Sequence, residues 1–127
     1  MLFVYPAVFH KEDGSFWVDF PDLPGCQTYG DTLNETIESA QEALSGYVLT
    51  LLEENTNLPA PSDINNIDHD SNAFVSLILS DIDQYKDVKA VKKTLTIPAW
   101  LNERAISMGV NFSKTLQDAL LSKVQTK

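Results

Sequence analysis

The chain has 127 residues, of which 43% are hydrophobic and 21% charged, so it can form one domain or a small domain with an appended module, and extensive disorder is excluded. Its one cysteine, Cys26, excludes an intrachain disulfide and a cysteine-based zinc site. The absence of a signal-like start and of a membrane-length apolar run indicates a cytoplasmic protein, for which we expect no cofactor.

The net charge of −9 is distributed unevenly along the chain. Residues 1–85 contain fifteen acidic residues and one basic residue, whereas residues 86–127 contain eight basic residues and three acidic ones. One interpretation is that the two parts have different partners, an anion such as nucleic acid for the basic part and a basic protein for the acidic part. The other is that the two parts neutralise each other within a folded monomer.

The first thirty residues have the pattern of three short strands. Residues 2–10 are rich in β-branched and aromatic side chains, and Asp13-Gly14 is a strong hairpin signal. The second strand, 15–20, alternates between two faces, with Phe16, Val18 and Phe20 on one and Trp17 and Asp19 on the other. After a proline-rich turn, residues 26–29 predict a short third strand.

An amphipathic helix is predicted over 32–54, capped by Asp31 or Thr32. Residues 55–72 have loop composition, and 73–79 predict a strand that returns to the same sheet. The order is β-β-β-α-β for a domain of residues 1–80, followed by a connector at 81–90. One helix covers one face of the sheet, so the other apolar face needs a cover, which is a partner protein, the connector or a second copy.

Residues 91–127 predict a separate module of one strand and two helices. The strand is 91–97, Pro98 starts the first helix and Gly109 ends it, and Asn111 or Ser113 caps the second. A segment this short cannot bury a core alone, whereas two copies pair their strands into a ribbon enclosed by four helices. The predicted dimer core contains Leu95, Ile97, Trp100, Leu101, Leu116 and Leu120.

The outer face of such a ribbon fits the major groove of DNA. Lys92, Thr94 and Thr96 are the predicted base contacts. Predicted phosphate contacts come from Lys93 and from the start of the second helix, at Asn111, Ser113 and Lys114. Over residues 91–124 this pattern resembles the ribbon-helix-helix fold of the Arc and MetJ repressors. The alternative is that the strand joins the N-terminal sheet, and its lysines only provide a solvent-exposed charged face.

The stretch FPDLPGCQTYGDTLNETIESAQEAL, residues 20–44, resembles the N-terminal domain of HicB-family antitoxins. The resemblance implies an α+β protein with a partial ribonuclease-H-like domain and no enzymatic activity. It implies that this domain neutralises a small basic toxin, HicA, which is an mRNA ribonuclease, and that the DNA-binding end represses the shared operon. The expected assembly is a homodimer through the C-terminal domain, and a higher hetero-oligomer with toxin. The outward face near Trp17, Asp19, Asp22 and Tyr29 is the expected toxin-binding surface.

Two other functions remain to be weighed. A metal-dependent nuclease using Asp19, Asp22, Asp31 and Glu35 is disfavoured, because Asp22 lies in a proline-rich turn and Asp31 has a sufficient role as a helix cap. The main alternative to an antitoxin is a ribbon-helix-helix transcriptional regulator whose N-terminal domain senses a small ligand.

Overall fold

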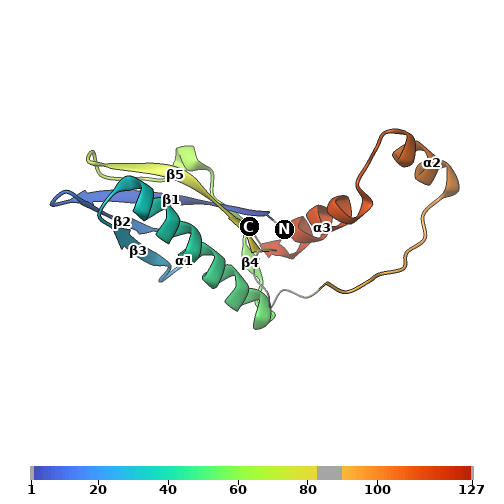
Figure 1. Cartoon of the computed structure of the whole chain (residues 1–127), viewed down its shortest axis with the longest axis horizontal. Coiled ribbons are helices and arrows are strands. Elements are labelled where there is room, and N and C mark those ends of the chain that lie inside the picture. The colour runs from blue at the N-terminus through green and yellow to red at the C-terminus, as the bar shows by residue number, and fades with distance from the viewer. Residues whose placement is uncertain (1, 83–89, 127) are drawn as a thin grey trace.

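The computed structural model describes residues 2–82 and 90–126 and shows an α+β protein with an antiparallel sheet and three α-helices (Figure 1). The sheet has the order β3-β2-β1-β5. Its strands are β1 (Leu2–Glu12), β2 (Ser15–Asp19), β3 (Gln27–Gly30) and β5 (Ala73–Asp81). One long helix, α1 (Leu33–Glu53), lies across one face. The predicted β-β-β-α-β order is therefore present, with β5 extending one residue into the predicted connector.

The β1–β2 hairpin sets which side chains share a face. Asp13 and Gly14 form the turn with positive φ angles of 51° and 83°, a conformation that Asp-Gly turns favour. The resulting register pairs Phe9 with Val18, which is fully buried, and His10 with Trp17 on the opposite face. The alternation predicted for residues 15–20 is confirmed by this register.

The core lies between α1 and the sheet. The sheet contributes alternate residues of β1 together with β2, and α1 contributes residues at helical spacing. The most deeply buried of these side chains are Phe3, Tyr5, Ala7, Phe9, Val18, Ala40, Leu44 and Val48. The N-terminal part therefore has a complete apolar core of its own.

The turn from β3 into α1 requires a glycine. A Cβ atom at Gly30 would lie 2.6 Å from Thr36 Oγ1 and 2.7 Å from the Thr36 backbone nitrogen, closer than side-chain atoms pack. Thr32 is the N-cap residue, and its Oγ1 accepts a hydrogen bond from the Glu35 backbone N–H at 3.2 Å. Of the two predicted caps, Thr32 is thus the one that caps the helix, while Asp31 accepts a hydrogen bond from Ser15.

The predicted loop at 55–72 contains two short elements, β4 (Leu58–Pro59) and the 3₁₀ helix η1 (Ile64–Asn66). Leu58 is buried in the core, which anchors this long connection. The backbone N–H of Ser62 donates to Asp22 Oδ2 at 2.9 Å, which ties the loop to the turn after β2. The sequence indicated only an irregular segment because two-residue strands have no detectable periodicity.

The C-terminal part contains α2 (Ala99–Ser107), α3 (Phe112–Val124) and β6 (Gln125–Thr126). Pro98 and Gly109 bound α2, and Asn111 Oδ1 caps α3 by accepting from the Lys114 backbone N–H at 3.0 Å. Residues 83–89, where the sequence predicted part of a connector, lie outside the described residues. No helix in the described ranges is long and apolar enough to cross a membrane.

Two features of this part differ from the sequence prediction. Residues 91–97 are not a strand in the single chain, because a strand needs a hydrogen-bonded neighbour and the described sheets offer none there. Joining of this segment to the N-terminal sheet, the alternative considered above, is therefore not seen among the described strands. In addition, β6 pairs in parallel with β4, a contact between the C-terminal end and the loop before β5 that the sequence did not indicate.

Candidate functional site

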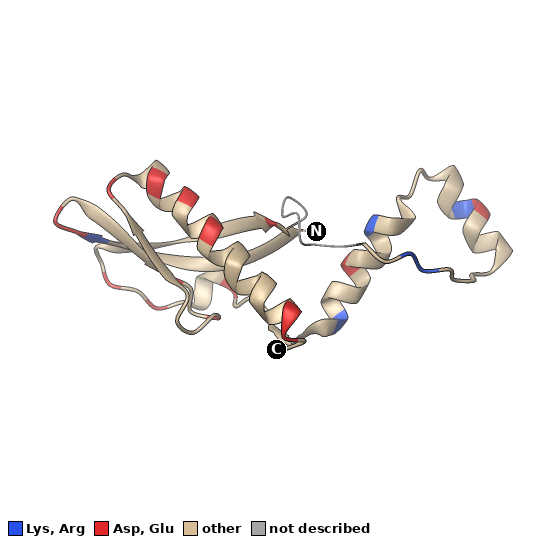
Figure 2. Ribbon diagram, turned by 60° about the horizontal axis from the view of Figure 1, so that its bottom comes forward, with Lys and Arg blue, Asp and Glu red and all other residues tan. Residues whose placement is uncertain are grey.

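The two ends of the molecule differ in charge. Asp and Glu residues lie over the N-terminal domain and along α1, whereas Lys and Arg residues lie mainly on residues 90–126 (Figure 2). Glu35, Glu38 and Glu42 form one exposed acidic row on α1. The separation predicted from the sequence is therefore a separation in space, and each end offers a surface to partners of opposite charge.

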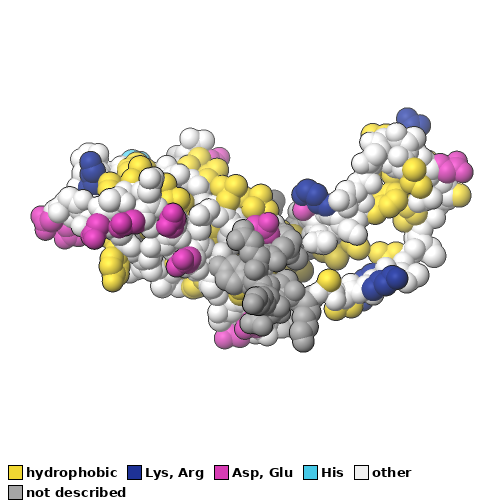
Figure 3. Space-filling model, viewed as in Figure 1, with side chains coloured by type: hydrophobic (Ala, Val, Ile, Leu, Met, Phe, Trp, Pro, Cys, Tyr) yellow, Lys and Arg dark blue, Asp and Glu magenta, His cyan; other side chains and the backbone are white. Residues whose placement is uncertain are grey.

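The C-terminal module has an open apolar side. Neither α2 nor α3 has a buried residue, and Leu95 and Trp100 are 64% and 67% exposed. Apolar side chains gather on the inner side of the curve that residues 91–97, α2 and α3 describe (Figure 3). All six predicted dimer-core residues lie in this module, and Leu116 is the only one of them that is even half-buried: Leu95, Ile97, Trp100, Leu101, Leu116 and Leu120. An apolar surface of this extent on a small module indicates a protein interface.

The DNA contacts predicted for the 91–97 segment are exposed to solvent. Lys92, Lys93, Thr94 and Thr96 are all exposed in an extended segment that ends at Pro98. An extended segment with alternating side chains is the geometry that a two-stranded ribbon requires. Their contact with DNA stays a prediction.

The start of α3 is the second predicted phosphate contact. Asn111 uses its side chain as the helix cap, while Ser113 and Lys114 are exposed beside it. Lys114 Nζ lies 3.2 Å from Asp118 Oδ2, an exposed pair of the i,i+4 type that contributes little energy and can open for a phosphate. This end of α3 shares a hollow of about 330 Å³ with Leu2 and Asp81 of the N-terminal domain.

In the N-terminal domain, three of the four expected toxin contacts share the face of the sheet that α1 does not cover. Trp17 on β2 lies directly opposite Tyr29 on β3, and Asp19 lies two residues further along β2. Tyr29 is 78% exposed, which is unusual for a large aromatic side chain. The sequence prediction therefore did bring these three residues together.

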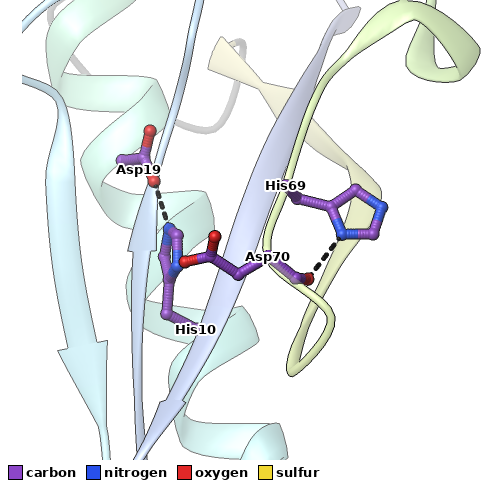
Figure 4. A network of polar contacts seen from close by, with 4 residues as sticks. All are labelled: His10, Asp19, His69 and Asp70. Carbon is purple, nitrogen blue, oxygen red and sulfur yellow. Dashed lines mark hydrogen bonds and ion pairs between the residues drawn. The ribbon is translucent and has the colours of Figure 1, made fainter.

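His10 contacts both Trp17 and Asp19, and the sequence did not indicate this role. Its ring stacks on Trp17 with centroids 3.8 Å apart and planes inclined by 12°. Its Nε2 atom lies 2.7 Å from Asp19 Oδ1 (Figure 4). The missed signal is the Asp-Gly hairpin, because its register places His10 directly opposite Trp17 on the uncovered face.

Asp22 has a different position from the other three. Its carboxylate accepts hydrogen bonds from the backbone N–H and the hydroxyl of Ser62 and so holds the loop that precedes β5. The loop and the sheet together enclose a hollow of about 580 Å³. Its lining is mostly polar: Val8, His10, Asp19, Pro21, Asp22, Ser62, Asp63, Asn66, Ile67 and Asp68. Asp22 thus shapes the surface beside Asp19.

Cys26 is buried, and burial raises the pKa of its thiol to about 11. At neutral pH the reactive thiolate form is therefore negligible, and the residue packs as a small apolar side chain. Among the described residues, no group of three or more His, Cys, Asp and Glu side chains is placed to hold a metal ion.

Comparison with known proteins identifies the family. Residues 5–124 match the model of the HicB-like antitoxin of bacterial toxin–antitoxin systems. The chain belongs to this HicB-like antitoxin family. Among curated proteins, an uncharacterized 14.9 kDa protein from the rep-hol intergenic region of Haemophilus phage HP1 is 33% identical over 104 residues, which cover 80% of this chain and 77% of the phage protein.

Solved structures of HicB antitoxins have the same overall architecture. The antitoxin HicB of Burkholderia pseudomallei superposes with a TM-score of 0.77 at 25% identity, covering 97% of this chain and 99% of that one. A chain of a toxin–antitoxin complex from Streptococcus pneumoniae superposes with a TM-score of 0.64 at 34% identity, covering 97% and 99%. The HicB-like match spans both candidate surfaces, the sheet face opposite α1 and the C-terminal module.

Proposed function

We propose that this antitoxin neutralises a small HicA-like ribonuclease toxin through its acidic N-terminal domain and represses its own operon through a dimeric C-terminal module. The observation that carries the proposal is the single family match over residues 5–124, which unites an acidic folded domain with a basic, unpaired module in one chain. The likeness to a chain of a toxin–antitoxin complex supports a toxin as the partner.

The toxin-binding role is assigned to the sheet face that α1 does not cover, in a partial ribonuclease-H-like domain. Trp17 and Tyr29 offer aromatic contact area, the kind of side chain that dominates protein interfaces. Asp19, held by His10, offers a fixed negative charge to a basic partner. An acidic domain attracts a basic RNA-binding protein and repels RNA itself. The antitoxin therefore competes with RNA for the RNA-binding surface of the toxin.

The DNA-binding role is assigned to a ribbon-helix-helix dimer. In this arrangement residues 91–97 of two chains pair as antiparallel strands, and Leu95 and Ile97 turn toward the helices. Lys92, Thr94 and Thr96 then face the major groove, while Lys93, Asn111, Ser113 and Lys114 contact phosphates. The exposed apolar side chains of α2 and α3 support this proposal, because two copies bury them against each other.

Co-expression tests the toxin-binding role directly. The full-length chain and the toxin encoded beside it are expressed together, and growth is compared with that of cells carrying a Trp17→Ala/Tyr29→Ala variant. We expect the wild type to restore growth and the variant to lose most of this protection while remaining folded. Full protection by the variant would remove the toxin-binding role from this face.

A further inference from the structure

The last residues of the chain attach the C-terminal module to the N-terminal domain. β6 pairs in parallel with β4, so that Gln125 lies beside Leu58 and Thr126 beside Pro59 (Figure 1). Gln125 also donates to the hydroxyl of Tyr5, a buried residue of β1, at 3.2 Å. We call this strand pair and hydrogen bond the β4–β6 contact. It determines where α3 lies relative to the sheet, because β6 follows α3 directly.

The β4–β6 contact is small. Each of its strands has two residues, and a two-stranded pair is marginal by itself in water. From α3, the half-buried side chain of Leu121 packs against the core of the N-terminal domain. A contact with so few buried groups opens at much lower free energy than either domain unfolds.

While this contact is closed, the start of α3 faces the N-terminal domain. Ser113 and Lys114, two of the proposed phosphate contacts, line a hollow of about 330 Å³ together with Leu2 and Asp81. Leu2 and Asp81 are register partners at one end of the β1–β5 pair, so the wall opposite α3 is the end of the sheet. A phosphate that approaches Lys114 here also approaches a carboxylate.

The charge of the N-terminal domain adds to the effect of this carboxylate. Residues 1–85 contain fifteen acidic residues and one basic residue. Electrostatic screening in salt extends over about 8 Å at physiological ionic strength, so a phosphate at α3 is still repelled by acidic groups in the wall of the hollow. Because DNA binding depends on neutralising phosphates with cations, an acidic surface at the same place opposes it.

We propose that the β4–β6 contact is autoinhibitory: it holds the phosphate-binding end of α3 against the acidic N-terminal domain and so weakens DNA binding. This inference rests on the DNA-binding role proposed above for the C-terminal module. Opening the contact moves the start of α3 away from Asp81. DNA binds the open arrangement more tightly and shifts the equilibrium toward it. The affinity of the wild type is therefore reduced by the fraction of molecules that are closed.

A reversible disulfide in the full-length chain tests this proposal. In Pro59→Cys/Thr126→Cys the new cysteines replace register partners on neighbouring strands, which lie about 4.8 Å apart, within the range of a disulfide. Oxidation holds the contact closed, and a reducing agent releases it. In fluorescence anisotropy, we expect the oxidised protein to bind DNA from upstream of the gene at least tenfold less tightly than the same protein after reduction. The buried Cys26 does not interfere, since its thiol remains protonated.

Two controls separate this effect from others. The single variant Pro59→Cys receives the same oxidation and reduction, and its DNA affinity should not change between them. Sedimentation should give the oxidised double variant the same mass as the wild type, which shows that the C-terminal dimer is intact. If the oxidised protein loses its dimer together with DNA binding, the effect belongs to the dimer and the proposal is wrong.

Removing the opposing charge should act in the opposite direction. Asp81→Asn takes a negative charge out of the hollow and should strengthen DNA binding severalfold at low salt and less at high salt. Asp13→Asn is the matched control, because it makes the same change in the β1–β2 turn at the other end of the sheet, where asparagine tolerates the positive φ. An equal gain for the two variants would contradict a local effect of Asp81.

The outcomes distinguish the inference from the proposed function. Equal or tighter DNA binding by the oxidised double variant would overturn autoinhibition and leave the DNA-binding role in place. Failure of the two cysteines to form a disulfide would show that the β4–β6 contact does not form. Absence of DNA binding by the wild type and by the reduced variant at low salt would contradict the DNA-binding role, and the inference with it.

Discussion

The N-terminal region buries its apolar side chains within the chain, whereas the C-terminal region leaves them exposed. In residues 2–82, fully buried side chains such as Phe3, Phe9 and Leu44 form a continuous core between the sheet and α1. In α2 and α3 no residue is buried, although their apolar spacing is as regular as that of α1. The difference shows that amphipathic periodicity identifies a surface that must be covered, while the covering element can be in the same chain or in another.

Breaking the proposed C-terminal dimer has the largest expected effect. Leu95→Asp places a charge where two copies bury an apolar side chain, which is too costly for the interface to form. We expect this variant to lose the C-terminal dimer and all specific DNA binding, while the N-terminal domain stays folded. Analytical ultracentrifugation and fluorescence anisotropy on DNA from upstream of the gene measure the two losses.

Thr94→Asp is the matched control, because it introduces the same charge one residue away on the opposite face of the proposed ribbon. It is expected to keep the C-terminal dimer and to lose DNA binding by charge repulsion from phosphate. If both variants dissociate to the same extent, the assignment of the two faces is wrong.

The next largest effect is expected on toxin affinity. Removing the exposed aromatic ring of Tyr29 by Tyr29→Ala should weaken toxin binding about 10-fold or more, corresponding to about 1.4 kcal/mol. Isothermal titration calorimetry with purified toxin measures the change. Leu33→Ala, an exposed apolar residue at the start of α1, serves as control and should leave the affinity unchanged.

A smaller effect is expected where the C-terminal end returns to the N-terminal domain. The buried Tyr5 hydroxyl donates to the Pro59 carbonyl at 2.6 Å and accepts from Gln125 Nε2 at 3.2 Å, next to the β4–β6 pair. Tyr5→Phe should lower the free energy of unfolding by about 1 kcal/mol. Tyr47→Phe removes a hydroxyl that donates to Pro24 at an exposed position, so its effect should be clearly smaller in urea denaturation.

The smallest effect concerns pH. Burial raises the pKa of the Cys26 thiol from 9.0 to about 11, so the unfolded chain loses this proton at lower pH than the folded one. The contribution of the thiol to stability is therefore complete below pH 9 and is lost as the pH rises toward 11. Cys26→Ala should show a shallower decline of stability than wild type over this range. Parallel curves for the two proteins would contradict the assigned cause.

Local sequence signals were sufficient for most of the elements. The Asp13-Gly14 turn, the Thr32 cap, and the Pro98 and Gly109 boundaries each act through backbone geometry that a few neighbouring residues determine. These positions agree between the sequence prediction and the structure.

The features that the sequence did not reveal depend on contacts between distant residues. The stacking of His10 on Trp17 follows from strand register, and the β4–β6 pair joins residues far apart in the chain. The 91–97 segment shows the opposite case, because its strand pattern is clear but it forms no strand with the described part of the chain. The sequence pattern indicates where a strand can form, but a strand forms only when a neighbouring strand supplies its backbone hydrogen bonds.

In the function proposed above, one end of this chain binds DNA while the other neutralises toxin. The most direct test measures both activities on one full-length variant, Lys92→Ala/Thr94→Ala/Thr96→Ala, with anisotropy on upstream DNA over a salt series and toxin rescue in cells. We expect tight, salt-sensitive DNA binding by wild type, loss of that binding in the variant, and undiminished toxin neutralisation. Equal DNA binding by the two proteins, or a joint loss of both activities in a folded variant, would contradict it.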